Sequence, residues 1–154
     1  MKWMPGLVTC LMFAALPRLD AAVDAHASRI VVDPDAYVGK AVTITVKFSK
    51  LDNSHESWEE QANLKASTMI KFTAGRLGDI KCYVARTQRN MEALAGLTKG
   101  KKLILTGTVR RYRTKVISTY DVTGGRHGAV RDVKRTVRGR VRYAFMVESI
   151  AQAK

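Results

Sequence analysis

The chain has 154 residues and a formal net charge of +14, because 27 Lys and Arg residues outnumber 13 Asp and Glu residues. This length is sufficient for one domain with one core, and no internal repeat or low-complexity segment is present. With two cysteines, one of them in the apolar N-terminal stretch, the rest of the chain keeps only Cys82, which excludes an internal disulfide there.

The N-terminus has the plan of a secretory signal peptide. A short basic start that includes Lys2 precedes an uncharged, largely apolar run at 3–16, and a small-x-small pattern ends at Ala27. The apolar run is too short for an ordinary membrane-spanning helix. We therefore expect residues 1–27 to be a signal peptide cleaved near Ala27, with export of a single domain at 28–154. The alternative is an uncleaved amphipathic N-terminus.

The first half of the domain is predicted to be strands. Residues 41–49 alternate between apolar and polar side chains, which is typical of a half-buried strand. A polar stretch follows, with one or two helical turns expected in 58–65. Residues 67–73 and 79–84 then have strand character on either side of a glycine-containing turn, so they are predicted to form a hairpin.

One helix is predicted after this hairpin. Thr87 is a plausible N-cap, and Met91, Leu94 and Leu97 recur at helical spacing. Gly100 is a natural C-terminal stop. We expect the apolar side of this helix to close one end of the domain.

Two more strands complete the domain. Residues 102–109 place alternate apolar side chains on one face. In 137–147 the odd positions are mainly apolar, while Arg138, Arg140 and Arg142 occupy even positions and are predicted to share the other face.

This element order is that of a mainly β, five-stranded OB-fold barrel with one helix between strands three and four. Four segments carry a closer resemblance: YVGKAVTITVKF at 37–48, CYV at 82–84, LTKGKKLILTGTV at 97–109 and YAFMVESI at 143–150. In these the chain resembles exported bacterial OB-fold proteins of the tRNA-anticodon-binding-like type, over roughly 33–109 and 143–150. It departs from them in a basic insert at 111–141, where this fold has a short or moderate loop.

The insert concentrates the positive charge. From Arg110 to Arg142 there are eleven Lys and Arg residues against two acids, Asp121 and Asp132, which leaves a net charge of +9. Strand-like residues flank a turn-rich segment at 123–128, so strands four and five are predicted to continue as a two-stranded arm. Charge concentrated in this way attracts polyanions.

We therefore expect a non-enzymatic module that binds a polyanion, with single-stranded nucleic acid favoured. OB-folds bind oligonucleotides across strands two and three and the adjoining loops, and single strands need cations for phosphates and aromatic rings for bases. The candidate residues are Lys71, Lys81 and Tyr83 on the outer face of strands two and three, and Arg110, Arg111, Tyr112, Arg113, Lys115, Arg138, Arg140 and Arg142 on the arm.

Two alternatives remain at this point. In the first, the protein is a secreted or periplasmic envelope protein, and its ligand is an acidic polysaccharide, lipid head groups or another protein in place of nucleic acid. The second concerns Tyr83 alone: its ring would cover the barrel on a solvated sheet face and would bind no ligand.

A catalytic function finds little support. His55-Glu56 resembles the start of a zinc-peptidase H-E-x-x-H motif, but Glu59 stands where the second histidine is needed. With one imidazole and no evident third ligand, no metal site and no cofactor are expected. A weaker enzymatic reading would rest on His55 and Glu56.

Overall fold

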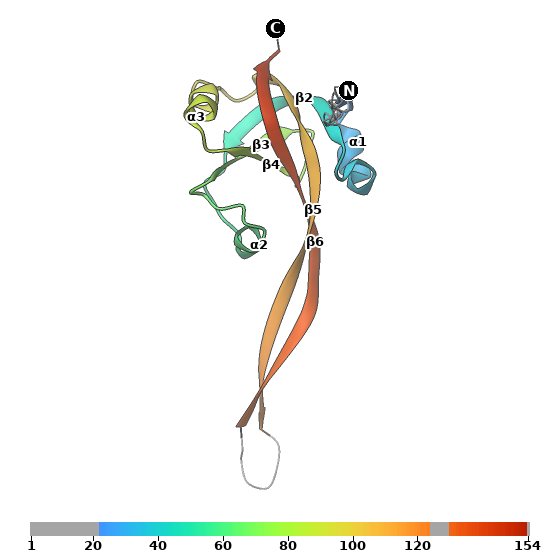
Figure 1. Ribbon diagram of the computed structural model, residues 1–154, viewed down its shortest axis with the longest axis vertical. Helices are drawn as coiled ribbons and strands as arrows, with labels where there is room; N and C mark the ends of the chain where they lie inside the picture. The colour runs from blue at the N-terminus through green and yellow to red at the C-terminus, as the bar shows by residue number, and fades with distance from the viewer. Residues whose placement is uncertain (1–21, 124–129, 154) are drawn as a thin grey trace, which may run out of the picture.

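The computed structural model of the protein describes residues 22–123 and 130–153, without the side chains of 116–123 and 130–138. Within these residues the chain is mainly β (Figure 1). The strands are β1 (Val23–Asp24), β2 (Ala41–Leu51), β3 (Met69–Gly75), β4 (Lys81–Ala85), β5 (Lys102–Thr123) and β6 (Val130–Gln152). The helices are α1 (Ala27–Val32), the 3-10 helix η1 (Pro34–Tyr37), α2 (Ser57–Gln61) and α3 (Gln88–Ala95).

Five of the strands pair in a closed ring. The sheet order is β1-β2-β3-β4-β6-β5, and β2 also pairs with β5. The β4–β6 pair is parallel and the other pairs within the ring are antiparallel. The strands predicted at 41–49, 67–73, 79–84, 102–109 and 137–147 are all present. This architecture confirms a mainly β fold and is consistent with an OB-like one.

The core fills the inside of this ring. In β2 the predicted alternation holds, with Val42, Ile44, Val46 and Phe48 buried. Gly107 in β5 is needed for close packing, because a Cβ there would overlap the Met146 carbonyl group of β6. The core therefore depends on apolar alternation and on one close strand-to-strand approach.

Helix α3 closes part of the core as predicted. The Thr87 hydroxyl accepts a hydrogen bond from the Asn90 N–H at 3.2 Å, which confirms the N-cap. Leu94 is 2% exposed, and Met91 and Leu97 are partly buried against the core. The predicted end was wrong: the helix stops at Ala95, and Gly100, with a φ of +89°, instead forms the turn before β5.

The N-terminal segment packs against the ring from Val23 onward. β1 pairs in parallel with β2, and the Ala25 N–H donates to the Thr43 carbonyl at 2.9 Å. Ala27 is 3% exposed and Ile30 is fully buried. The packed chain thus begins upstream of the boundary expected at Ser28. Cleavage near Ala27 stays a prediction, and residues 1–21 lie outside the described part of the chain.

A two-stranded arm extends from the ring. The pairing of β5 with β6 continues to Thr123 and Val130, and Figure 1 shows this ribbon projecting well beyond the other elements. The predicted extension of strands four and five is therefore present. The turn-rich segment expected at its tip lies almost entirely outside the described residues.

Candidate polyanion interface

The outer face of β3 and β4 is covered, contrary to expectation. Lys71 and Tyr83 are direct partners across these strands, and they are 4% and 0% exposed. The connection between β2 and β3 folds α2 over them, and Trp58 packs edge-on against Tyr83 with ring centroids 6.5 Å apart. The prediction that Lys71 and Tyr83 lie exposed on a ligand-binding face was therefore wrong.

Glu59 of α2 satisfies both of these buried polar groups. Lys71 Nζ donates to Glu59 Oε1 at 2.9 Å and to Oε2 at 3.1 Å, and the Tyr83 hydroxyl donates to Oε1. Among the described side chains that are not exposed, no buried polar atom lacks a partner. Lys71 and Tyr83, which were expected to contact a ligand, thus make their polar contacts with Glu59 inside the protein.

The protonation states follow from this cluster. Burial raises the pKa of Glu59, but hydrogen bonds from Tyr83 and Lys71 outweigh burial and hold that pKa below its ordinary value. Burial and the neighbouring Glu59 carboxylate raise the pKa of Tyr83. At neutral pH, Glu59 is therefore a carboxylate that accepts from a neutral phenol and an ammonium group.

Lys81 has a different environment. Its side chain is partly exposed, and Nζ lies 4.0 Å from Asp52 Oδ2, which also lies 3.7 Å from Lys71 Nζ. Burial raises the pKa of Asp52, yet hydrogen bonds from Ser54 and the charges of Lys71 and Lys81 lower it overall. Of the three residues predicted on this face, Lys81 is the one with substantial exposure.

The residues of the broken zinc-peptidase motif have structural contacts. The Trp58 Nε1–H donates to Glu56 Oε2 at 2.9 Å, and the Glu56 N–H donates to Glu59 Oε2 at 2.6 Å. The Glu56 N–H bond to Glu59 is half of a capping box at the start of α2, and the other half is the bond that the Glu56 side chain accepts from the Glu59 N–H. No group of three or more potential metal-ligating side chains occurs in the part of the chain that the structure describes.

The base of the arm brings most of the predicted cations together. By register, Tyr112 and Arg142 are opposite each other and face α2: Tyr112 lies 5.9 Å from Trp58 between ring centroids, and Arg142 is 3.7 Å from Glu56. On the other side of the ribbon, Arg111 is 3.3 Å from Asp35 of η1. Each of these ion pairs is partly exposed and therefore weak.

Four further cations at the arm base are exposed and form no ion pair among the described residues. They are Arg110, Arg113, Lys115 and Arg140. Unlike Arg111 and Arg142, they have no acidic partner within ion-pair distance among the described residues to offset their mutual repulsion. These four residues, referred to below as the arm-base cations, are the most available positive charge on the predicted interface.

The predicted common face of three arginines is wrong. Arg113 pairs with Val141, but Lys115 pairs with Arg138, so β6 contains one extra residue at this point. The Thr114 hydroxyl donates to the Arg140 carbonyl at 3.2 Å, and a Cβ on Gly139 would overlap Thr114. The extra residue reverses the alternation, so the register puts Arg138 on the opposite side of the ribbon from Arg142.

Sequence reasoning missed the role of α2. Helical turns were expected near Trp58, but their position over β3 and β4 was not. The available signal was the pair of buried apolar residues in this polar stretch, Trp58 and Leu64, which pack with Tyr83 and Ala144 in a second, smaller core.

Comparison with known proteins gives a structural likeness but no match in sequence. No family model matches the chain, and no curated protein matches it. One solved structure, from Leishmania major Friedlin and described as an aspartyl-tRNA synthetase, aligns with 96% of this chain at a TM-score of 0.46 and 12% identity. The aligned part is 23% of that protein's chain. A likeness at this level indicates neither a shared family nor a shared ligand.

Proposed function

We propose that the ring of five strands is an OB-fold barrel and that the protein is a non-enzymatic module that binds single-stranded nucleic acid through the base of its arm. The observation that carries this proposal is the group of four arm-base cations, which are exposed and unpaired among the described residues. Unpaired cations on a fixed ribbon are suited to successive phosphates, whose counterions are released on binding.

An aromatic residue among these cations favours nucleic acid over other polyanions. Tyr112 lies between Arg110 and Arg113 in β5 and is partly exposed where the arm leaves the ring, whereas Trp58, which packs against it, is buried. Base stacking on an accessible aromatic ring contributes roughly 1–3 kcal/mol per base. In this proposal the arm base replaces the β3–β4 face as the binding surface, because Glu59 and Trp58 cover Lys71 and Tyr83.

A second candidate is an exported protein that binds an acidic polysaccharide of the cell envelope. The signal-like N-terminal sequence favours it, since most nucleic acid is intracellular. Within the described residues, no helix is long and apolar enough to cross a membrane. The same arm-base cations would bind sulfates or carboxylates, but the Tyr112 ring would contribute little to binding.

The test compares two ligands on two variants of equal charge. One variant replaces the arm-base cations with Ser, and the control replaces Lys40, Lys65, Lys99 and Lys101, which are also exposed and without ion pairs in the described chain. Binding is measured by fluorescence anisotropy with an oligothymidylate of about 16 nucleotides, the upper end of OB-fold site sizes, and with heparin.

We expect the wild type to bind the oligonucleotide more tightly than heparin. The arm-base variant should lose most of this affinity, and the control should lose little. Equal losses of oligonucleotide affinity in the two variants would show that binding depends on net charge alone, and they would contradict an interface at the arm base. Tighter binding of heparin, lost in the arm-base variant, would select the second candidate.

A further inference from the structure

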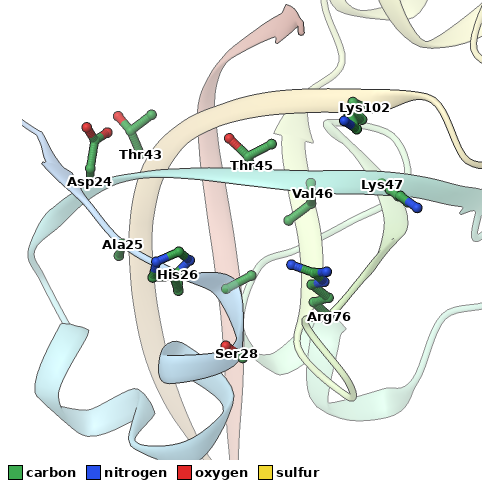
Figure 2. A pocket seen from close by; sticks show the side chains of 11 residues that line it. Asp24, Ala25, His26, Ser28, Thr43, Thr45, Val46, Lys47, Arg76 and Lys102 are labelled. Atoms are coloured by element: carbon green, nitrogen blue, oxygen red, sulfur yellow. The ribbon is translucent and has the colours of Figure 1, made fainter.

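A second cationic site lies on the outside of the ring, away from the arm. An open pocket of about 620 Å³ lies between the N-terminal segment, β2, the start of β5 and the turn that joins β3 to β4 (Figure 2). Lys47, Arg76 and Lys102 line it together with the hydroxyl-bearing residues Ser28, Thr43 and Thr45. Lys102 is the first residue of β5, while the arm is the other end of that strand.

Strand register forces these three cations together. Lys47 of β2 is the direct partner of Lys102 in β5, and on its other side it is the partner of Gly75, the residue before Arg76. Like charges directly opposite each other destabilise a sheet. None of the three forms an ion pair among the described residues.

The acid in the pocket lies too far away to neutralise them. Asp24 lines the opposite end, where it is the partner of Thr43. Thr43 is four residues from Lys47 along β2, a separation of about 13 Å at the usual rise of a strand. The pocket thus has a cationic end without a counter-charge of its own in the described chain.

Arg76 has a conformation that its residue type rarely adopts. Its φ is +71°, in the left-handed region that favours glycine, although glycines are available on both sides of it at Gly75 and Gly78. Figure 2 shows its side chain extending from the turn toward β2. A strained backbone that directs a guanidinium group into a pocket is the kind of feature found at ligand sites.

We propose that this pocket binds a phosphate group, held between Lys47, Lys102 and Arg76. A dianion would neutralise the opposed lysines, the guanidinium group offers paired N–H donors to phosphate oxygens, and the Thr45 hydroxyl is a further donor. The pocket is the size of a small-molecule site. The ligand class is therefore inorganic phosphate or the phosphate of a small monoester, not a polymer.

The first test measures thermal unfolding of the full chain in phosphate and in chloride at matched ionic strength. The test variant replaces Lys47 and Lys102 with Thr, and the control replaces Lys99 and Lys101, which lie outside the pocket lining. Phosphate stabilises most proteins by exclusion from their surface. The informative quantity is therefore the difference between the phosphate-induced rise in Tm of the wild type and that of the test variant.

We expect the wild type and the control to gain more Tm in phosphate than the test variant does. In chloride at low ionic strength, the test variant should melt higher than the wild type, because the opposed charges are gone. An equal phosphate effect in all three proteins would overturn the proposal.

Calorimetric titration tests the binding directly. Inorganic phosphate and glycerol 3-phosphate are titrated into the wild type, into R76G, and into the variant that lacks the arm-base cations. We expect R76G to weaken binding at least tenfold and the arm-base variant to bind as the wild type does. Tighter binding of the monoester would identify an organic phosphate as the ligand. Loss of phosphate binding in the arm-base variant would contradict a separate site.

Discussion

Glu59 is the residue on which the covered face of β3 and β4 depends. It is 1% exposed, and its carboxylate accepts from both Lys71 and Tyr83. Without the Glu59 charge, the buried Lys71 ammonium group would keep only the more distant Asp52, whose Oδ2 lies 3.7 Å from Lys71 Nζ. Loss of the closer partner of a buried charge is far more costly than the loss of a surface pair.

We predict that Glu59→Gln lowers the free energy of unfolding by about 3–5 kcal/mol at pH 7, the usual cost of breaking a buried ion pair. The control is Glu60→Gln on the exposed side of the same helix, which should change stability by less than about 0.5 kcal/mol. Urea unfolding followed by circular dichroism measures both. An unchanged midpoint in Glu59→Gln would show that the buried ion pair with Lys71 does not stabilise the fold.

The pH dependence of stability follows from the same carboxylate. The pKa of Glu59 in the folded state lies below its ordinary value of 4.5. The contribution of the Glu59 carboxylate to the free energy of unfolding is therefore complete above the unfolded-state pKa, and it is lost as the pH falls through the folded-state pKa. We predict that wild-type stability declines below about pH 4.5 and that Glu59→Gln lacks part of this decline. Parallel pH profiles of the two proteins would contradict the assignment.

At the scale of elements, α3 and the N-terminal segment both cover the ring. Leu94→Ala should destabilise the protein by roughly 2–5 kcal/mol, because the leucine is almost fully buried in the main core. The exposed Glu92 on the same helix gives a control, Glu92→Ala, with a small effect. The measurement is again the urea midpoint, and equal midpoints for the two variants would show that α3 is peripheral.

The N-terminal segment gives a prediction about processing. A chain that begins at Ser28 lacks β1, the hydrogen bond from Ala25 to Thr43 and the buried Ala27. At about 1 kcal/mol for each hydrogen bond lost, it should be less stable than a chain that begins at Ala22 by about 1–3 kcal/mol. Comparison of the two melting curves tests this. Equal stability would mean that cleavage near Ala27 leaves the domain intact.

The predictability of the fold from sequence also differs between elements. Alternation at 41–49, the turn glycines and the Thr87 cap predict β2, the β3–β4 hairpin and α3, because each signal is local. The position of α2 over Lys71 and Tyr83 could not be predicted in this way. It depends on Glu59 and Trp58 meeting side chains from strands that follow later in the chain, and alternation alone does not distinguish a solvated face from a covered one.

At the scale of the whole molecule, the apolar core and the exposed cations of the arm lie in different parts of the structure. The ring contains the apolar clusters, and the four arm-base cations lie on the ribbon that leaves it. The composition of the insert predicts this separation. The extra residue in β6 near Gly139 does not follow from composition, and it decides that Arg138 and Arg142 are on opposite sides.

The central claim is that phosphates bind to the base of the arm, and the salt dependence of oligonucleotide affinity tests it most directly. For single strands, the slope of log affinity against log salt is about −0.7 for each phosphate neutralised, so removing the four arm-base cations should reduce its magnitude by about 3. The matched variant at Lys40, Lys65, Lys99 and Lys101 should keep the wild-type slope. Identical slopes in all three proteins would contradict the claim.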